Sequence, residues 1–101
     1  MIICAAIKDK RNGKVFSGVR HNDIYEMLYN LDYKIDAIEG FVDEENNFYD
    51  RFAAYDYALE HHQLPRTVVE WKEEKFERKL YSEDLYCVHD LNVQCNFRVF
   101  T

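Results

Sequence analysis

The hydrophobic positions at the beginning of the chain predict two strands joined by a tight turn. Residues 2–7 are apolar throughout and are typical of a largely buried strand. Asn12-Gly13 follows a run of charged residues and favours a type I′ turn, because that turn needs positive φ at both central positions. A second strand over about 14–19 would then return beside the first.

Two later stretches have the spacing of helices. In the first, which begins near Ile24, apolar residues recur at i, i+3, i+4 and i+7, and His21 or Asn22 is expected to cap the helix. In the second, over about 51–62, Asp50 is the expected N-cap and Leu64-Pro65 the expected end. The apolar residues of the first helix are Ile24, Met27, Leu28 and Leu31. The inner face expected for the second consists of Phe52, Tyr55 and Leu59, with Ala54 and Ala58 beside them.

The remaining segments predict shorter elements. Residues 32–39 are expected to be irregular or briefly extended, and a polar turn over 43–47 separates two extended pieces. Thr67 to Glu70 fits a capping box for a third helix over 68–80, although a solvated, partly frayed segment explains its many charges nearly as well. Residues 93–100 alternate in polarity, which predicts a half-buried strand at a sheet edge or a subunit contact. The extended pieces are Phe41-Val42 and Phe48-Tyr49, and the apolar stripe of the third helix is Val69, Phe76 and Leu80.

Together these elements predict a small α+β domain over residues 1–101, with an antiparallel sheet packed against two main helices. With 48% hydrophobic and 32% charged residues, the composition is that of a folded globular protein. A chain this short buries only about 60–65% of its unfolded surface, so association with other copies would stabilise it. Because 16% of the residues are aromatic, some rings are expected in stacking or subunit contacts.

The charge and the cysteine content limit the classes of partner and compartment. The net charge of −6 excludes general binding to duplex nucleic acid or to an anionic membrane, but it is compatible with a local basic pocket. The apolar runs are too short to cross a bilayer, and the first residues lack the basic leader of a signal peptide. The three cysteines fit no disulfide framework, so we expect reduced thiols and a cytoplasmic protein.

Two arginines stand where helices are predicted to begin. Arg20-His21 lies where a strand gives way to a helix, and the unpaired N–H groups there would make these side chains a phosphate cradle. The alternative is a surface charge beside a capping or core histidine. Arg51 opposes the helix dipole at the second helix start, so it needs a compensating partner. That partner is either Asp50 or another acid in an ion pair, or an anionic ligand.

The segment after the third helix carries acids and metal-ligand types. Ser82-Glu83-Asp84 is typical of an N-cap followed by two acids at a helix start. Adjacent acids point in different directions, so a shared metal is not expected, whereas a general base, a contact to ribose or a contact to an Arg of a neighbouring subunit stays open. Cys87, His89, Asp90 and Cys95 have no zinc-site spacing, and we expect no metal and no cofactor. Neither a P-loop nor a dinucleotide-binding motif occurs, so no enzyme is indicated.

Three blocks become specific in combination: a strand entering Gly-x-Arg-His, then Gly-Phe-Val and Phe-x-Asp-Arg before an Ala-rich helix, then Leu-Tyr-Ser-Glu-Asp-Leu. This order resembles a family of small phage and prophage proteins that includes the anti-Thoeris sponges of the first type. The resemblance spans roughly residues 1–86. The matching residues are Gly18, Arg20, His21, Gly40, Phe41, Val42, Phe48, Asp50, Arg51, Ala54, Ala58 and Leu80 through Leu85. Tyr49 departs from the pattern, and 87–101 has no counterpart in it.

The resemblance implies binding without turnover. Such sponges sequester cyclic ADP-ribose-type signals made by bacterial TIR-domain defence enzymes, and some hold cyclic oligonucleotides. They are homo-oligomers whose ligand pockets form between subunits. Carried over, Arg20 and Arg51 would bind phosphate or pyrophosphate, and an aromatic ring would stack on the base. The candidate ligand-binding residues are Arg20, His21, Phe41, Phe48, Arg51, Ser82, Asp84 and Tyr86.

The leading hypothesis is therefore a phage-encoded, homo-oligomeric anti-defence protein that sequesters a cyclic nucleotide signal. One rival is a protein-interaction module that inhibits a host protein directly, which predicts a large exposed apolar patch. A second rival is a small nucleotide hydrolase with His21 or Glu83 as general base. The state of the recovered ligand separates these classes, since a sponge releases it intact.

Overall fold

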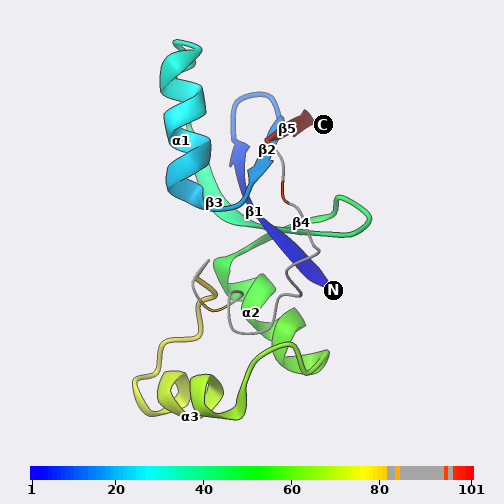
Figure 1. Cartoon of the computed structure of the whole chain (residues 1–101), viewed down its shortest axis with the longest axis vertical. Helices are drawn as coiled ribbons and strands as arrows, with labels where there is room; N and C mark the ends of the chain where they lie inside the picture. The colour runs from blue at the N-terminus through cyan, green and yellow to red at the C-terminus, as the bar shows by residue number, and fades with distance from the viewer. Residues whose placement is uncertain (82–83, 85–94, 96) are drawn as a thin grey trace.

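The computed structural model describes residues 1–81, 84, 95 and 97–101, and within them five strands and three helices form an α+β fold, as predicted. The antiparallel sheet has the order β4-β3-β1-β2-β5, and α1 and α2 pack against it (Figure 1). α3 lies at one end of the molecule, beyond α2 (Figure 1). The elements are β1 (Ile2–Asp9), β2 (Val15–Gly18), α1 (His21–Asn30), β3 (Ala37–Asp43), β4 (Phe48–Asp50), α2 (Arg51–Glu60), α3 (Arg66–Glu74) and β5 (Arg98–Phe100).

The hairpin of β1 and β2 forms as predicted, but its turn is not of type I′. Gly13 has a φ of +75°, whereas Asn12 is not in the positive-φ region. The loop is longer than two residues, since the Asp9 amide donates to the Lys14 carbonyl at 2.8 Å and the Gly13 amide donates to the Asp9 carbonyl at 2.9 Å. Asn12 does not adopt the left-handed backbone conformation. Its side-chain oxygen accepts a hydrogen bond from the Lys14 amide, and this closes the turn.

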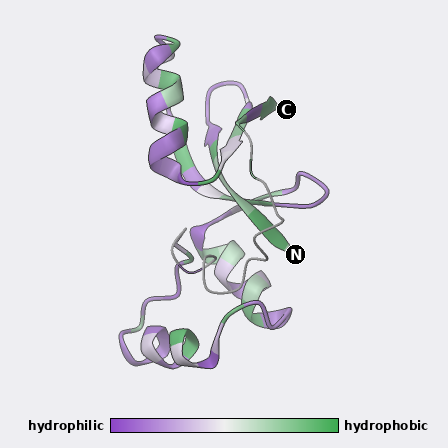
Figure 2. Ribbon diagram, viewed as in Figure 1, coloured by the Kyte–Doolittle hydropathy of each residue, from purple (hydrophilic) through white to green (hydrophobic). Residues whose placement is uncertain are grey.

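The main core lies between one face of the sheet and the two helices α1 and α2. Figure 2 shows the N-terminal part of β1 as hydrophobic and the turn that follows it as hydrophilic. A smaller cluster on the opposite face contains Cys4, Ala6, Val15 and Val42, with Phe48 and Phe100 packed against it. The main cluster contains Ile2, Ala5, Ile7, Phe16, Ile24, Leu28, Phe41, Ala54, Tyr55 and Leu80. Full burial of one such aliphatic side chain is worth about 1.5–3 kcal/mol.

The starts of α1 and α2 differ in how they are capped. Asp50 is the N-cap of α2, as predicted, and its side chain accepts from the Ala53 amide at 2.8 Å. The capping of α1 by His21 or Asn22 was a wrong prediction, because Arg20 is the N-cap and no side-chain hydrogen bond caps the helix. His21 is the first helical residue and its ring points into the protein.

The faces of α2 and α3 also depart from the prediction. Phe52 is 56% exposed, whereas Ala54, Tyr55 and Ala58 form the buried face of α2. α3 has Pro65 as its N-cap and no side-chain cap, so the capping box at Thr67 does not form. Because α3 ends at Glu74, Phe76 and Leu80 lie beyond it and do not share its face.

The helices α1, α2 and α3 end in the same backbone motif. The residue after the C-cap has positive φ, and the amide of the following residue donates to a carbonyl five positions back, which is the Schellman arrangement. Glycine is usual at the positive-φ position, but here Asp32, His62 and Phe76 have φ of 54°, 55° and 55°. The backbone amides of Tyr33, Gln63 and Glu77 donate to the carbonyl oxygens of Leu28, Ala58 and Lys72, at 2.9, 2.8 and 2.9 Å respectively.

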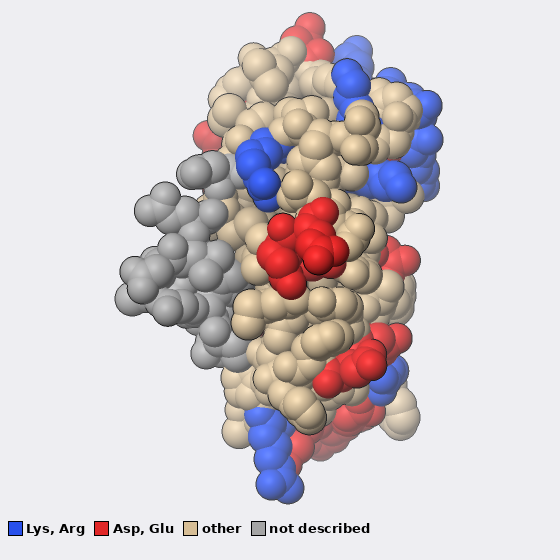
Figure 3. Space-filling model, turned by 90° about the vertical axis from the view of Figure 1, so that its right-hand side faces the viewer, with Lys and Arg blue, Asp and Glu red and all other residues tan. Residues whose placement is uncertain are grey.

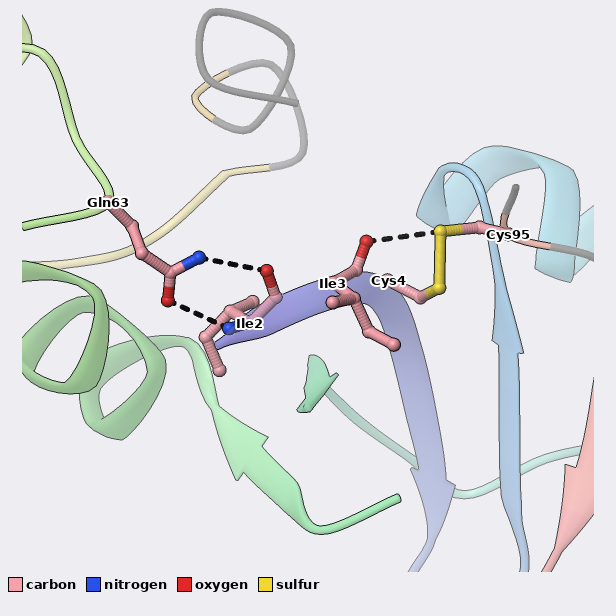
Figure 4. The surroundings of a disulfide bond; sticks show 5 residues. All are labelled: Ile2, Ile3, Cys4, Gln63 and Cys95. Carbon is pink, nitrogen blue, oxygen red and sulfur yellow. Dashed lines mark hydrogen bonds between the residues drawn. A yellow bond between two sulfur atoms is a disulfide. The ribbon is translucent and has the colours of Figure 1, made fainter. Parts of the chain in front are cut away.

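Two long-range links hold the beginning of β1 (Figure 4). The side-chain amide of Gln63 binds the backbone of Ile2, accepting at 2.8 Å and donating at 3.0 Å, so it acts like a neighbouring strand. Cys4 and Cys95 form a disulfide with a Cα–Cα distance of 5.6 Å, which corrects the prediction of reduced thiols for this pair. Of the strand predicted over 93–100, β5 forms at 98–100, and residues 93, 94 and 96 lie outside the described residues, as does Cys87.

Candidate functional site

The first turns of α1 and α2 meet over β3, and Arg51 lies where they meet. Its guanidinium donates to Glu39 Oε1 at 2.9 Å and to the Leu80 carbonyl oxygen at 2.8 Å, and it lies 3.4 Å from His21 Nδ1. We call His21, Tyr25, Glu39, Arg51 and Tyr81 the Arg51 cluster. Arg51 at the helix start therefore pairs with an acid of the same chain. That acid is Glu39 and not the neighbouring Asp50.

His21 has both ring nitrogens in contact with protein atoms. Its Nε2 lies 2.7 Å from the Gly40 carbonyl oxygen, which can only accept, so Nε2 donates and Nδ1 faces Arg51. The ring also meets Phe41 edge to face, with centroids 5.2 Å apart. Burial lowers the pKa of His21, and the nearby Arg51 charge adds to this effect. The imidazole is thus a neutral structural link between α1 and β3 near pH 7.

Glu39 also has both carboxylate oxygens occupied. Arg51 binds one oxygen, and the Tyr25 hydroxyl donates to the other at 2.8 Å. Burial by itself would raise the pKa of Glu39, but the hydrogen bonds from Arg51 and Tyr25 outweigh it and lower the pKa. Burial and the bond to Glu39 raise the pKa of Tyr25 to about 12. The carboxylate is therefore ionised and engaged.

The Arg51 cluster reaches the surface at one side. The side chains of Arg51 and Glu39 are 18% and 37% exposed. The guanidinium carbon lies 5.0 Å from the centroid of the Tyr81 ring, so a cation and an aromatic face stand next to each other. Chemically, the cluster combines a cation, the carboxylate that pairs with it and an aromatic ring beside them.

Gly40 sets the position of Arg51. A Cβ atom at this residue would lie against the Tyr49 carbonyl oxygen, 2.7 Å from the Phe48 ring and 2.9 Å from Asp50 Cα. The glycine thereby lets β4 approach β3 closely, with Gly40 paired to Asp50. Since Arg51 follows Asp50 directly, this approach places its side chain over Glu39.

The structure brings some of the candidate ligand-binding residues together and separates others. His21, Phe41 and Arg51 are neighbours, but Phe41 is fully buried and has no face open to a base. Phe48 lies on the opposite face of the sheet, where its ring is 5.9 Å from Lys8 Nζ. Arg20 is an exposed residue at the α1 start. Ser82 and Tyr86 lie outside the described residues.

Asp84 binds its own chain. Its Oδ2 is 3.0 Å from the fully buried Lys72 ammonium and accepts from the Tyr81 amide at 2.8 Å. Lys72 also donates to the Lys79 carbonyl at 2.8 Å and lies 4.7 Å from the Tyr81 ring. The pair fixes Tyr81, and through Tyr81 it supports the side of the Arg51 cluster.

Sequence reasoning missed Glu39, Tyr25, Tyr81 and Lys72. Glu39 has a local signal, because it lies two residues before Phe41 and shares its face of β3, but the sequence predicts only irregular or briefly extended backbone over 32–39. Lys72 has no local signal, because a lysine in a helix is normally exposed, whereas here it is the buried residue of α3. Tyr25 and Tyr81 become neighbours of Arg51 only through the tertiary fold.

Charge is unevenly distributed on the face shown in Figure 3. Most of its Lys and Arg side chains gather in the upper part and most of its acidic side chains lie in the middle and lower parts, although an acidic group lies at the top and basic groups lie at the lower end (Figure 3). Four basic residues, Lys8, Lys10, Arg11 and Lys14, belong to the β1–β2 hairpin, and Arg11 is paired with Asp9. A protein with a net charge of −6 therefore presents a local positive region.

The sequence blocks that supply the Arg51 cluster lie in a region that matches a known protein family. The sequence matches the family described as Phage T4 y16D protein over residues 1–86. The chain belongs to this family. No curated protein and no solved structure matches it at a significant level.

The match covers α1, α2, α3 and the whole Arg51 cluster, whereas β5 and Cys95 lie after it. It confirms the prediction of a phage protein family, and the resemblance to anti-Thoeris sponges stays a prediction. Within the described residues, no helix is long and apolar enough to span a membrane, and no three potential ligands are grouped to hold a metal ion.

Proposed function

We propose that this phage protein binds and sequesters a cyclic nucleotide signal of bacterial defence, without turnover, as a homo-oligomer. The signal is a cyclic ADP-ribose isomer or a cyclic oligonucleotide, as the sponge resemblance implies. The Arg51 cluster is the proposed contact for its phosphate groups. Tyr81 is the ring proposed for stacking.

The observation that carries the proposal is the convergence of two helix starts on one arginine and one carboxylate. A helix start favours an anion, and here the first turns of α1 and α2 meet at the Arg51–Glu39 pair. Glu39 holds the position that a phosphate oxygen would take. A bisphosphate ligand would replace this single carboxylate with more charge and more acceptors.

The state of the titratable groups supports binding over catalysis. A general base needs a lone pair directed at the substrate. In the Arg51 cluster, both nitrogens of His21 and both oxygens of Glu39 already contact protein atoms. The hydrolase alternative with His21 as base would require this network to open, and Glu83 lies outside the described residues.

The test is retention of cyclic ADP-ribose isomers by the purified protein on a filter, followed by heating and mass spectrometry of the released material. Wild type should release the ligand at its original mass, and Arg51→Ala should retain at least tenfold less. Arg66→Ala is the matched control, because Arg66 is an exposed arginine at the start of α3. Equal retention by Arg51→Ala and Arg66→Ala would contradict the site, and a changed mass would indicate the hydrolase.

A second candidate function is the protein-interaction module, which the exposed apolar side chains favour. Trp71 and Phe76 at α3 are 49% and 92% exposed, and Tyr29 and Leu31 at the end of α1 are 84% and 61% exposed. Ligand passing through the filter unbound, together with capture of one defined host protein, would support this candidate.

A further inference from the structure

Phe76 combines an unfavourable backbone conformation with an exposed ring. It occupies the positive-φ position that ends α3, with φ of 55°, and its side chain is 92% exposed. A bulky residue is rare in this region, and glycine would avoid the strain. The equivalent positions of α1 and α2 hold the polar residues Asp32 and His62. The ring at position 76 is therefore costly to the isolated chain in two ways, and contact with another molecule would offset both.

The surroundings of Phe76 give this end of α3 its chemical character. Trp71 is 49% exposed, and the ammonium of Lys75 lies 5.3 Å from its ring. Lys75 directly precedes Phe76 and is itself exposed. We call Trp71, Lys75 and Phe76 the aromatic end. It presents two aromatic rings with a cation between them in sequence.

A pocket beside the first turns of α1 has the complementary character. Its volume is about 210 Å³, and its apolar lining includes Val19, Ile24, Met27 and Phe97. Val19 and Met27 are 46% and 40% exposed, so the pocket opens to solvent. Asp23 supplies the charge of its lining. We call this space the α1 pocket.

We infer that the aromatic end of one copy docks into the α1 pocket of a second copy. An apolar cavity of about 150 Å³ is enough to hold benzene, so the α1 pocket has room for the ring of Phe76. With the ring inserted, the neighbouring Lys75 would stand at the rim where Asp23 lies, and opposite charges would meet. This contact deepens the proposed function and rests on its homo-oligomer, but it needs no nucleotide, so a failure of self-association is distinguishable from a failure of ligand binding.

The placement of the two surfaces requires the contact to form between different copies. The aromatic end lies with α3 at one end of the molecule, whereas α1 lies toward the other end (Figure 1), and the longest dimension is 40 Å. A chain cannot fill its own pocket in this arrangement. Each contact joins two different surfaces, so copies add head to tail in a row or a ring, or two copies make the contact twice in a reciprocal dimer. One inserted ring gives a small interface, and we expect association that depends strongly on concentration.

The experiment is sedimentation velocity of the full chain over a range from micromolar to hundreds of micromolar. Wild type should show a weight-average sedimentation coefficient that rises with concentration. Phe76→Gly should sediment as a monomer throughout, and its thermal midpoint should rise because glycine relieves the positive φ. This rise distinguishes loss of the contact from loss of the fold. His62→Gly is the matched control, since it relieves the same backbone position in α2 and should still associate.

A mixing experiment tests the head-to-tail arrangement. Met27→Glu puts a second carboxylate into the α1 pocket but leaves the aromatic end intact, and it should be monomeric alone. Mixed in equal amounts, Phe76→Gly and Met27→Glu should form a dimer of about twice the monomer mass, because one keeps the pocket and the other keeps the ring. A monomeric wild type, association of Phe76→Gly, or a mixture that stays monomeric would each overturn the inference.

Discussion

The junction of α1 and α2 and the end of α3 treat charge and apolar surface in opposite ways. At the junction, the charged side chains of Glu39 and Arg51 reach the surface over a buried Phe41. At α3, Lys72 is fully buried, whereas Trp71 and Phe76 are exposed. The first arrangement follows from a helix face packed on a sheet. The second shows that the α3 segment is organised around one buried cation, which leaves its apolar residues outside.

The two regions are also held in place by different interactions. The junction is fixed by backbone proximity, since Gly40 allows β4 and the start of α2 to contact β3. The end of α3 is fixed by the Lys72–Asp84 ion pair. Different substitutions should therefore weaken the two regions.

The largest effect is expected for Gly40→Ala. The added Cβ would meet backbone atoms of Tyr49 and Asp50, which cannot move without displacing β4. We expect a loss of about 3 kcal/mol or more in the free energy of unfolding, measured by urea denaturation. Gly13→Ala is the control, because its Cβ meets open space and only the φ of +75° opposes it, at a cost of about 1 kcal/mol. Equal losses for the two variants would contradict the role of close approach at Gly40.

A smaller loss is expected for Lys72→Met. The substitution keeps the length of the side chain but leaves the carboxylate of Asp84, which is 14% exposed, without its cation. We expect a loss of about 2 kcal/mol in urea denaturation. The double variant Lys72→Met/Asp84→Asn removes both charges and should recover at least half of that loss. If the double variant is no more stable than the single one, the ion pair is not what holds this end.

The smallest effect is a pH dependence at the junction. The pKa of His21 in the folded state is lowered from its ordinary value of 6.5, so the unfolded chain binds a proton more readily. Stability should therefore fall as the pH decreases through 6.5, and it should not change from this source above that value. His21→Gln, which keeps a donor for the Gly40 carbonyl but does not titrate, should show a shallower decline between about pH 7.5 and pH 5.5. Identical declines in the two proteins would contradict the buried, neutral imidazole.

The contrast between the regions also explains what the sequence could predict. The hairpin of β1 and β2, the helices α1 and α2 and the Asp50 cap depend on local patterns, and the structure confirms them. The capping by His21 failed, because the Gly40 carbonyl, distant in sequence, binds the imidazole. The disulfide could not be predicted, since Cys4 and Cys95 are 91 residues apart and spacing carries no information on that pairing.

The candidate site was predicted in part. Local capping rules identified Arg51 as an arginine in need of an anionic partner, and the structure supplies Glu39. The choice among acids could not be made from spacing, because it depends on the pairing of β3 with β4. The stripe predicted for the third helix failed for a related reason. Burial of Lys72 depends on Asp84, the Lys79 carbonyl and the Tyr81 ring, none of which belongs to α3.

The most direct test of the account is isothermal titration of cyclic ADP-ribose isomers into wild type and Glu39→Gln. Glutamine keeps the size of the side chain but removes the charge that competes with the ligand for Arg51. The account predicts saturable heat for wild type and at least threefold tighter binding for Glu39→Gln. No heat with either protein would contradict sequestration of this signal, and weaker binding by Glu39→Gln would contradict the exchange of Glu39 for a phosphate group at Arg51.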